Sequence, residues 1–456
     1  MTDRARALGL TAARVTVERV TAEESVRAQS RVAGALAQRG IERGGRVAFL
    51  CPSSGGLIAA LLGALRAGIV PVCLNPSLLE HERRLLLDDA DPDLVVEPRE
   101  LASLLEGPEA DLAPVPLARP MHYTSGTTGR PKGVWSGVLD ETAAVALHDD
   151  ESTVWGFSAD DRLLVASPLH HSAPLRFSAG VLLAGGEVCV LERFDAAAVV
   201  EAVAAFRPTV AFFVPAHLHR LFALGALPPL DSFRLLAHAG APCPVALKEA
   251  ALAAFPSGTV WEFYGSTEGQ FTVCSPDEWL ARPGTVGRAR PRRTVWVDDG
   301  TIWCDVPHFA RFEYWRDPEK TAQAWRGSAF TVGDLGRLDD DGFLFLDGRR
   351  DDLIISGGVN VYPNEVEAAL SMTAGIDEVV VFGVPDDRWG ERVCAAVIGD
   401  VSAGAVVAHA RATLAAYKCP KDVYLVDDLP RTASGKVRRS AVAGHLGLDV
   451  QRRDRG

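Results

Sequence analysis

The sequence lacks the segments that direct a chain into or across a membrane. No apolar run approaches the ~20 residues that a helix needs to cross a bilayer. The amino-terminal stretch MTDRARALGLTAARV is interrupted by charges too often to be a secretory signal. We therefore expect a soluble, cytoplasmic protein without a membrane partner, and both a monomer and a homodimer stay open.

The chain is also short of positive charge. It has 47 lysines and arginines against 59 aspartates and glutamates, a formal net charge of −12. A protein that binds nucleic acid or an anionic membrane through a broad surface needs the opposite balance. We expect no nucleic-acid partner, and any anion must be bound by a local site.

Cysteine is present, but not in a pattern that binds metal or forms a redox pair. The eight cysteines lie far apart, without a C-x-x-C pair, and mostly within apolar runs. We expect them to be reduced residues of the core.

The length and the apolar patterning predict an α/β protein. With 456 residues and 48% apolar composition, the chain can form at least two structural units. Residues 45–76 read as a strand at 47–51, a helix at 54–67 that begins at Ser54 and stops before Gly68, and a strand at 69–74. Such a βαβ unit implies a parallel sheet, and the pattern recurs up to about residue 290.

The patterning changes twice towards the carboxyl terminus. Between about residues 290 and 347, short aromatic and β-branched runs alternate with Asp-Gly pairs that favour tight hairpins. After GRRDDLIISGG, the α/β alternation resumes. The sequence thus predicts a large N-terminal domain, residues 1–350, of mixed and parallel sheets sandwiched with helices, including a β-rich subdomain. A small α/β (α+β) domain follows at residues 351–456.

The run YTSGTTGRPKGV, residues 123–134, has the composition of a phosphate-binding loop, because glycines let the backbone approach a phosphate while hydroxyls and a lysine supply donors. It is not a Walker loop, since Pro131 and Gly133 replace that motif's second glycine and its hydroxyl. It resembles the phosphate loop of the adenylate-forming superfamily, which includes acyl- and aryl-CoA synthetases, adenylation domains and luciferases. The resemblance implies that Lys132 is catalytic and that ATP is bound by Thr124, Ser125, Gly126, Thr127, Thr128 and Gly129.

A second segment, EFYGSTEG, resembles the family's YG-x-TE motif. The resemblance implies that Tyr264, next to Gly265, stacks on adenine and that Thr267 contacts the α-phosphate. It also implies that Glu268 holds Mg²⁺ together with Thr128, and a carboxylate oxygen is a ligand that suits this hard cation. Alone, such a string is more often a strand that ends in a turn.

The acid pocket is the least defined part of the resemblance. AHAGAPCP resembles a turn that lines the adenine and acyl pockets, with Gly240, Ala241 and Pro242 in it, and SPLHHSAP places His171 at a pocket position. Each aromatic residue of this region, taken alone, is more often part of a core. The residues that we predict to line the acid pocket are His171, Phe177, Phe213, Val214, His217 and Gly240.

The remaining motifs of the family lie towards the carboxyl terminus. The resemblance implies that Asp334 and Arg349 bind the ribose hydroxyls, and that Lys436 in PRTASGKVRR bridges the substrate carboxylate and the α-phosphate. It implies that Asp351 is the hinge of a mobile C-terminal lid, although a fixed loop with a salt-bridged aspartate is the alternative. After rotation of the lid, Gly357 and Gly358 would line the tunnel for the thiol.

Together, the motifs imply an ATP- and Mg²⁺-dependent ligase that activates a small or aromatic carboxylic acid as an acyl-AMP, releases pyrophosphate and passes the acyl group to CoA. Two alternatives stay open. One is a stand-alone adenylating enzyme whose acceptor is a carrier protein or an amine, including members that activate nitrite for diazotisation. The other is a nucleotide-binding protein without catalytic activity.

Overall fold

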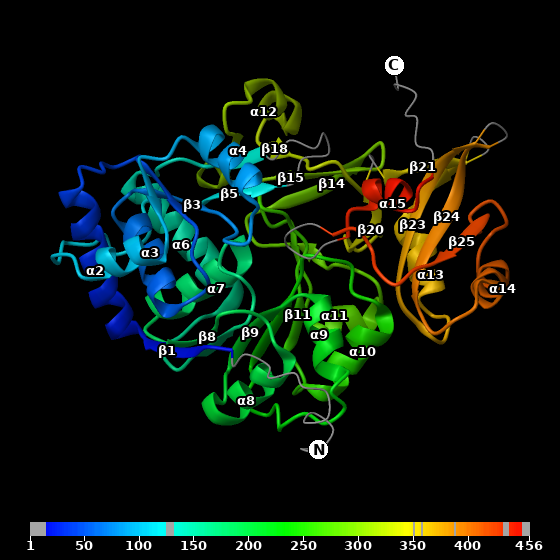
Figure 1. Ribbon diagram of the computed structural model, residues 1–456, viewed down its shortest axis with the longest axis horizontal. Coiled ribbons are helices and arrows are strands. Elements are labelled where there is room, and N and C mark those ends of the chain that lie inside the picture. The colour runs from blue at the N-terminus through cyan, green and yellow to red at the C-terminus, as the bar shows by residue number, and fades with distance from the viewer. Residues whose placement is uncertain are drawn as a thin grey trace.

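The first of three six-stranded sheets forms the lower part of the larger body in Figure 1. A computed structural model describes residues 15–124, 132–349, 352–356, 359–386, 389–431 and 437–448. In the first sheet, β1 is antiparallel to β8 and the other pairings are parallel. Its strands, in spatial order, are β1 (Val17–Thr21), β8 (Glu187–Leu191), β7 (Arg162–Val165), β9 (Val210–Phe213), β10 (Leu235–His238) and β11 (Val260–Glu262).

The second sheet combines parallel and antiparallel strands. The pairings of β4 with β2, β2 with β3 and β3 with β5 are parallel, whereas β6 pairs antiparallel with both β5 and β16. The predicted βαβ unit is confirmed, because β2 and β3 flank a helix and Ser54 Oγ caps it by accepting from the N–H of Leu57 at 3.1 Å. The strands in spatial order are β16 (Glu313–Tyr314), β6 (Lys132–Trp135), β5 (Met121–Thr124), β3 (Val70–Cys73), β2 (Arg46–Phe49) and β4 (Leu94–Val96).

Helices fill the space between the two sheets and cover their outer faces. α3 is buried along most of its length and packs on α2, α5 and α7, and α7 in turn packs on the first sheet. Leu163 and Val165 of β7 belong to this central core, whereas Leu164 faces a second core under α8 and α9. The helices are α2 (Ala22–Gln38), α3 (Gly55–Arg66), α4 (Glu80–Ala90), α5 (Pro98–Leu105), α6 (Glu141–Trp155), α7 (Ser172–Leu183), α8 (Ala196–Phe206), α9 (Pro215–Phe222), α10 (Val245–Ala254) and α11 (Pro276–Ala281).

The predicted β-rich segment forms a third sheet. Its first hairpin turns at Asp299 and Gly300, whose φ values of +47° and +71° suit a tight turn between twisted strands. The strands are β14 (Thr294–Asp298), β15 (Thr301–Asp305), β17 (Trp325–Arg326), β18 (Ala329–Phe330), β19 (Asp334–Leu338) and β20 (Leu344–Arg349), with α12 (Pro318–Ala324) and the short helix η1 (His308–Ala310) beside them. A separate two-stranded sheet contains β12 (Thr272–Val273) and β13 (Arg288–Ala289).

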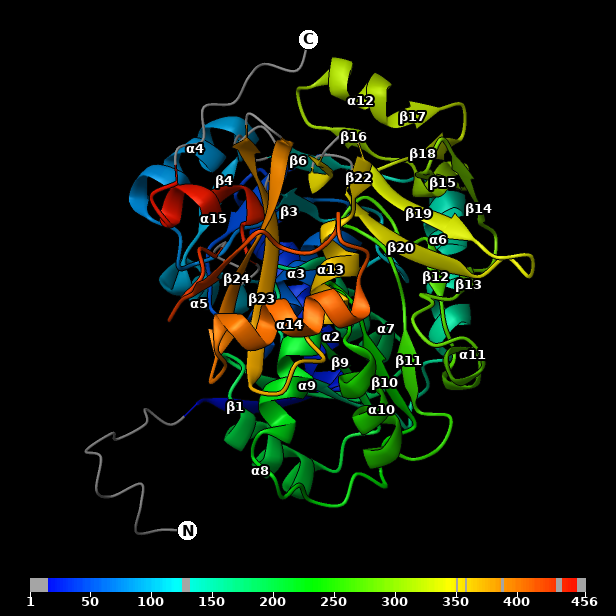
Figure 2. The same cartoon turned by 90° about the vertical axis from the view of Figure 1, so that its right-hand side faces the viewer.

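The carboxyl-terminal part has its own sheet and its own hydrophobic clusters; Figure 1 shows it beside the larger body, and Figure 2 shows it in front of that body. The long strands β23 and β24 pair antiparallel at its centre. Its elements are β21 (Ile354–Ser356), β22 (Val359–Val361), α13 (Pro363–Leu370), β23 (Ile376–Asp386), β24 (Gly390–Gly399), α14 (Ala403–Thr413), β25 (Asp422–Leu425) and α15 (Arg439–His445).

The expectation that the cysteines are core residues is confirmed for seven of the eight. All eight thiols are free, and seven are buried, whereas Cys243 is partly exposed. Within the part of the chain that the structure describes, no helix combines the length and the hydropathy needed to cross a bilayer.

Candidate active site

The ends of the phosphate-loop segment are held by a β-hairpin. Thr124 is the last residue of β5 and lies opposite Lys132, the first residue of β6. The Tyr123 hydroxyl donates to Asp89 Oδ2 at 2.7 Å and so fixes the end of β5 to α4. The intervening loop candidates Ser125, Gly126, Thr127, Thr128 and Gly129 lie outside the described residues.

The YGSTEG segment forms a compact turn after β11. The N–H of Ser266 donates to the carbonyl of Gly269 at 2.8 Å, and the N–H of Glu268 donates to Ser266 Oγ at 3.2 Å. Gly265 is required here, because a Cβ at this position would lie 2.7 Å from the carbonyl oxygen of Gly269. Thr267 is half-buried in the turn.

Two tyrosines connect this turn to the β-rich part. The Tyr264 hydroxyl donates to Asp334 Oδ2 at 2.7 Å, and the Tyr314 hydroxyl donates to Glu268 Oε1 at 2.9 Å. Glu268 is only 6% exposed, so the tyrosine satisfies a carboxylate that is largely removed from water. The structure thus brings together Tyr264, Asp334 and Glu268, which were predicted to bind adenine, ribose and metal. Arg349 lies opposite Asp334 in the β19–β20 ladder, and its side chain is not described.

Lys132 lies beside this group. Its ammonium is 5.7 Å from the centroid of the Tyr314 ring, and the ammonium of Lys320 lies 5.9 Å from the same ring. Burial and the neighbouring Lys320 lower the pKa of Lys132 to about 8, although Glu268 and Asp317 oppose the shift. Tyr314 and Lys320 were not predicted from the sequence, where the local signal is the helix start DPEK.

The predicted turn Gly240–Ala241–Pro242 lies next to this group because of sheet topology. It follows β10, and the YGSTEG turn follows β11, the adjacent parallel strand. Carboxyl ends of neighbouring parallel strands open onto a common crevice where ligands bind. Gly240 has φ of +89°, a conformation that favours glycine, and all three residues of the turn are exposed.

A buried ion pair supports both strand ends. Lys248 of α10 is fully buried, and its Nζ lies 2.5 Å from Nε2 of His238 and 3.3 Å from Oε2 of Glu262. Burial raises the pKa of Glu262, and burial together with Lys248 holds the pKa of His238 well below its usual range. His238 and Glu262 are the last residues of β10 and β11, so the pair fixes the starting points of both turns.

Two of the predicted acid-pocket residues lie in hydrophobic cores. Phe177 is 2% exposed and packs against Trp155 and Phe212, with ring centroids 5.2 and 5.7 Å away. Phe213 is 1% exposed and faces the core under α8 and α9. Their role in a pocket stays a prediction, and a direct contact with the acid would require these rings to leave their packing.

The other predicted pocket residues follow the carboxyl ends of β7 and β9. His217 stacks in parallel on Phe194, with centroids 3.9 Å apart, and its Nδ1 lies 3.4 Å from Ser167 Oγ. Val214 lies between the end of β9 and the start of α9, and its Cγ1 is 3.5 Å from where a Cβ on Gly240 would lie. His171 packs against His170, with ring centroids 4.4 Å apart.

A further histidine, His122, contacts this group and was not singled out from the sequence. Nδ1 of His122, in β5, lies 3.0 Å from the carbonyl oxygen of His170, so this nitrogen must be the one that carries hydrogen. Burial lowers the pKa of His122 to about 4 and that of His170 to about 3. Both imidazoles are therefore neutral near pH 7.

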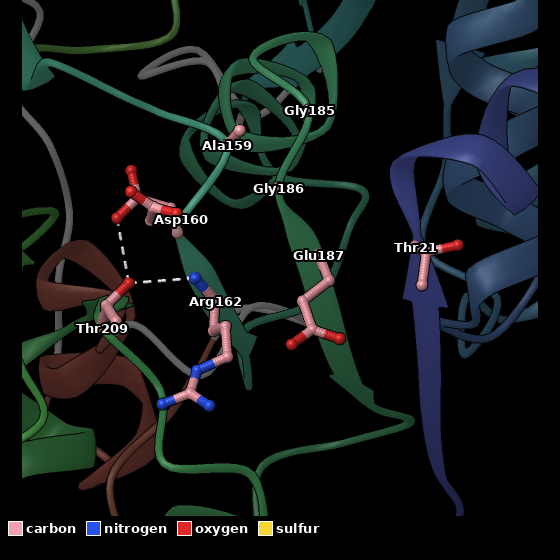
Figure 3. A pocket seen from close by; sticks show the side chains of 9 residues that line it. Thr21, Ala159, Asp160, Arg162, Gly185, Gly186, Glu187 and Thr209 are labelled. Atoms are coloured by element: carbon pink, nitrogen blue, oxygen red, sulfur yellow. Dashed lines mark hydrogen bonds between the residues drawn. The ribbon is translucent and has the colours of Figure 1, made fainter.

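An open hollow of about 360 Å³ lies away from these residues, at the amino-terminal ends of β7 and β8 (Figure 3). Two of its polar side chains, Asp161 and Thr209, are hydrogen-bonded. Asp161 accepts from Thr209 Oγ1 at 2.9 Å and from Arg234 Nε at 2.7 Å, and Thr209 Oγ1 also accepts from the N–H of Arg162. The hollow lies at the edge of the sheet opposite to the residues that the sequence predicted.

The remaining candidates lie outside the described residues. These are Lys436, the hinge residue Asp351, and Gly357 and Gly358 of the predicted thiol tunnel. Their roles stay predictions.

Comparison with known proteins gives matches along nearly the whole chain. The family described as AMP-binding enzyme matches residues 3–301, and the AMP-binding enzyme C-terminal domain matches residues 365–436. Long-chain-fatty-acid–CoA ligase FadD13 of Mycobacterium tuberculosis (strain ATCC 25618 / H37Rv) is 31% identical over 91% of this chain and 90% of its own length. Indoleacetate–CoA ligase of Aromatoleum aromaticum (strain DSM 19018 / LMG 30748 / EbN1) is 33% identical over 90% of each chain.

Two solved structures share the fold over more than nine-tenths of the chain. The o-succinylbenzoate CoA synthetase MenE of Bacillus subtilis, in complex with ATP and magnesium, has a TM-score of 0.81 and 27% identity, covering 92% of this chain and 94% of its own. The amide bond synthetase McbA of Marinactinospora thermotolerans has a TM-score of 0.80 and 29% identity, covering 94% and 95%.

Proposed function

Because the chain belongs to the AMP-binding enzyme family and is an ATP-dependent, AMP-forming acid–thiol ligase, we propose that it activates a small or aromatic carboxylic acid and transfers the acyl group to CoA. The observation that best supports this proposal is the pair of tyrosine contacts around the YGSTEG turn. They join Tyr264 to Asp334 and Tyr314 to Glu268, with Lys132 beside them. Predicted sites for adenine, ribose, metal and phosphates therefore lie within one small region.

The proposed first step is attack of the substrate carboxylate on the α-phosphorus of ATP. The bond to the bridging oxygen of pyrophosphate breaks, and an acyl-AMP forms. Lys132 stabilises the outgoing pyrophosphate, while Thr267 and Lys436 stabilise the charge on the α-phosphate. Acyl-AMP has a good leaving group, so a thiol can then displace AMP and form the thioester.

The residues present fit a magnesium ion. Glu268 offers a buried carboxylate that is oriented by Tyr314, and carboxylate oxygens are the ligands that this cation prefers. When bound, Mg²⁺ would neutralise phosphate charge. We propose Glu268, with Thr128, as its protein ligands.

The proposed division of labour places ATP and acid binding in residues 1–350 and the catalytic lysine on residues 351–456. Rotation at Asp351 would withdraw Lys436 after adenylation and bring Gly357 and Gly358 to the site. Changes at a hinge can control turnover without touching the reacting atoms. An Asp351→Pro variant should then form acyl-AMP normally and fail in thioester formation.

We propose a small or aromatic acid, and the close packing of the Trp155, Phe177 and Phe212 rings against one another agrees with a compact acid-binding region. The compact segment between His171 and Gly240 also supports this choice. An amine acceptor is a second candidate, since the chain is similar to an amide bond synthetase.

The test is pyrophosphate release across a panel of small aromatic and aliphatic acids plus nitrite, with and without CoA. We expect release with an acid and acceleration by CoA, together with formation of the acyl-CoA. Release that CoA never accelerates would favour a carrier protein or an amine as acceptor. No release with any panel member would contradict the proposal. The control is Lys436→Ala, which we expect to lower adenylation by about 10²–10³-fold while the protein stays folded.

A further inference from the structure

Two lysines, rather than one, border the phosphate-loop segment. Lys132 begins β6, and β16 pairs with the same strand through Tyr314 and Val134. The N–H of Trp315 extends this pairing by donating to the carbonyl of Gly133 at 2.8 Å. α12 follows almost at once, so Lys320 is fixed next to the strand that begins with Lys132.

The position of Lys320 is set by the cap of its helix. Asp317 is the N-cap of α12, and its Oδ1 accepts from the N–H of Lys320 at 3.0 Å. The Lys320 ammonium lies 5.9 Å from the Tyr314 ring centroid, and that of Lys132 lies 5.7 Å from it. The Tyr314 ring therefore lies close to two ammonium groups, and its hydroxyl donates to the Glu268 carboxylate.

Two ammonium groups this close repel each other, and Lys320 is among the causes that lower the pKa of Lys132. Among the described residues, the lysines that form ion pairs with carboxylates are Lys248 and Lys418, whereas Lys132 and Lys320 form none. The nearest carboxylates have other partners, since Glu268 accepts from Tyr314 and Asp317 caps α12. A cluster with this charge favours a polyvalent anion as its partner.

We infer that Lys320 is a second phosphate-binding lysine, which together with Lys132 binds the β- and γ-phosphates of ATP and then the released pyrophosphate. The inference rests on the use of ATP and does not depend on the identity of the acid or of the acceptor. A polyphosphate has enough negative charge to face both ammonium groups, whereas AMP ends at the α-phosphate. Lys320 should therefore distinguish ATP and pyrophosphate from AMP.

The experiment measures equilibrium binding of Mg-ATP, Mg-pyrophosphate and AMP without the acid, so that no turnover occurs. Lys320→Met keeps the length of the apolar stem over Tyr314 and removes the charge. We expect its Kd for ATP and for pyrophosphate to rise by about 10-fold or more, with an unchanged Kd for AMP, because a contact between charged groups is worth at least one decade in affinity. Lys320→Arg should retain most of the affinity.

Arg316→Met is the matched control, since it removes an exposed positive charge four residues away that pairs with Asp91. Equal weakening of ATP and AMP binding by Lys320→Met would show a structural role and overturn the inference. An ATP affinity no lower than that of Arg316→Met would overturn it as well. Failure of the proposed function is distinguishable, because the unmodified protein would then release no pyrophosphate with any acid.

Discussion

Replacing Lys248 with methionine tests how the ends of β10 and β11 are held. The side chain is fully buried, with Nζ 2.5 Å from His238 Nε2 and 3.3 Å from Glu262 Oε2. Methionine fills a similar volume but leaves the Glu262 carboxylate, 8% exposed, without its cation. Breaking a buried pair from one side costs about 3–5 kcal/mol. That is a large part of the roughly 5–15 kcal/mol by which a folded protein is stable.

The pH dependence of this loss has a definite sign. Burial raises the pKa of Glu262 in the folded state, so the folded protein retains a proton that the unfolded chain has lost above its ordinary pKa. Stability therefore falls as the pH rises through this window. Removing Lys248 raises the pKa of Glu262 further, because Lys248 opposes the effect of burial. We expect a larger deficit at pH 8 than at pH 5.5, by up to ~1.4 kcal/mol for each pH unit in which Glu262 titrates.

Urea unfolding followed by tryptophan fluorescence measures the deficit, since eight of the nine tryptophans precede residue 350. The double variant Lys248→Met, Glu262→Gln removes both charges, and we expect it to recover most of the loss. A deficit below about 1 kcal/mol for the single variant would refute this account of the pair. So would a double variant that is no more stable than the single one, or a deficit that does not change with pH.

Two further variants test other contacts of the site. The pKa of His122 is lowered from its ordinary 6.5 to about 4, so its contribution to stability is complete above pH 6.5 and is lost as the pH falls towards 4. The free energy of unfolding, measured with urea at pH 7 and 4.5, should therefore fall by about 3 kcal/mol less in His122→Leu than in the unmodified protein. An unchanged pH dependence of stability in this variant would contradict the expectation. Tyr264→Phe deletes the hydroxyl that donates to Asp334 and should raise the Kd for ATP by about 10-fold with little change in melting temperature. ATP affinity equal to that of the unmodified protein would show that this hydrogen bond does not position Asp334 for the nucleotide.

The regular elements could be predicted from the sequence because their signals are local. Ser54 and Gly68 delimit α3 to within a residue, and the Asp-Gly pair at 299–300 predicted the first hairpin of the β-rich part. Apolar alternation and caps act over a few residues, so they are readable without the fold. The antiparallel additions β1 and β16 carried no such signal, since each joins a sheet whose other strands lie far away in the sequence.

The candidate site shows the same division between local and distant information. The motif residues Tyr264, Glu268 and Asp334 could be recognised by resemblance, and the structure places them together. Tyr314 and Lys320 could not, because their meaning depends on β16 pairing with β6. Lys248 carries no local sequence signal of burial, because lysines are mostly exposed, and only the packing of α10 shows that its ammonium is buried.

The pairing of β16 with β6 limits what insertions and deletions this enzyme can tolerate. The ladder is only two residues long, Glu313 with Trp135 and Tyr314 with Val134. Side chains alternate along a strand, so a register slip of one residue would turn the Tyr314 ring to the opposite face of the sheet. It would also move Lys320 away from Lys132. The number of residues between Tyr314 and Lys320 therefore sets the position of Lys320 relative to Lys132. Loop exchanges between relatives should preserve this number even where the residues themselves differ.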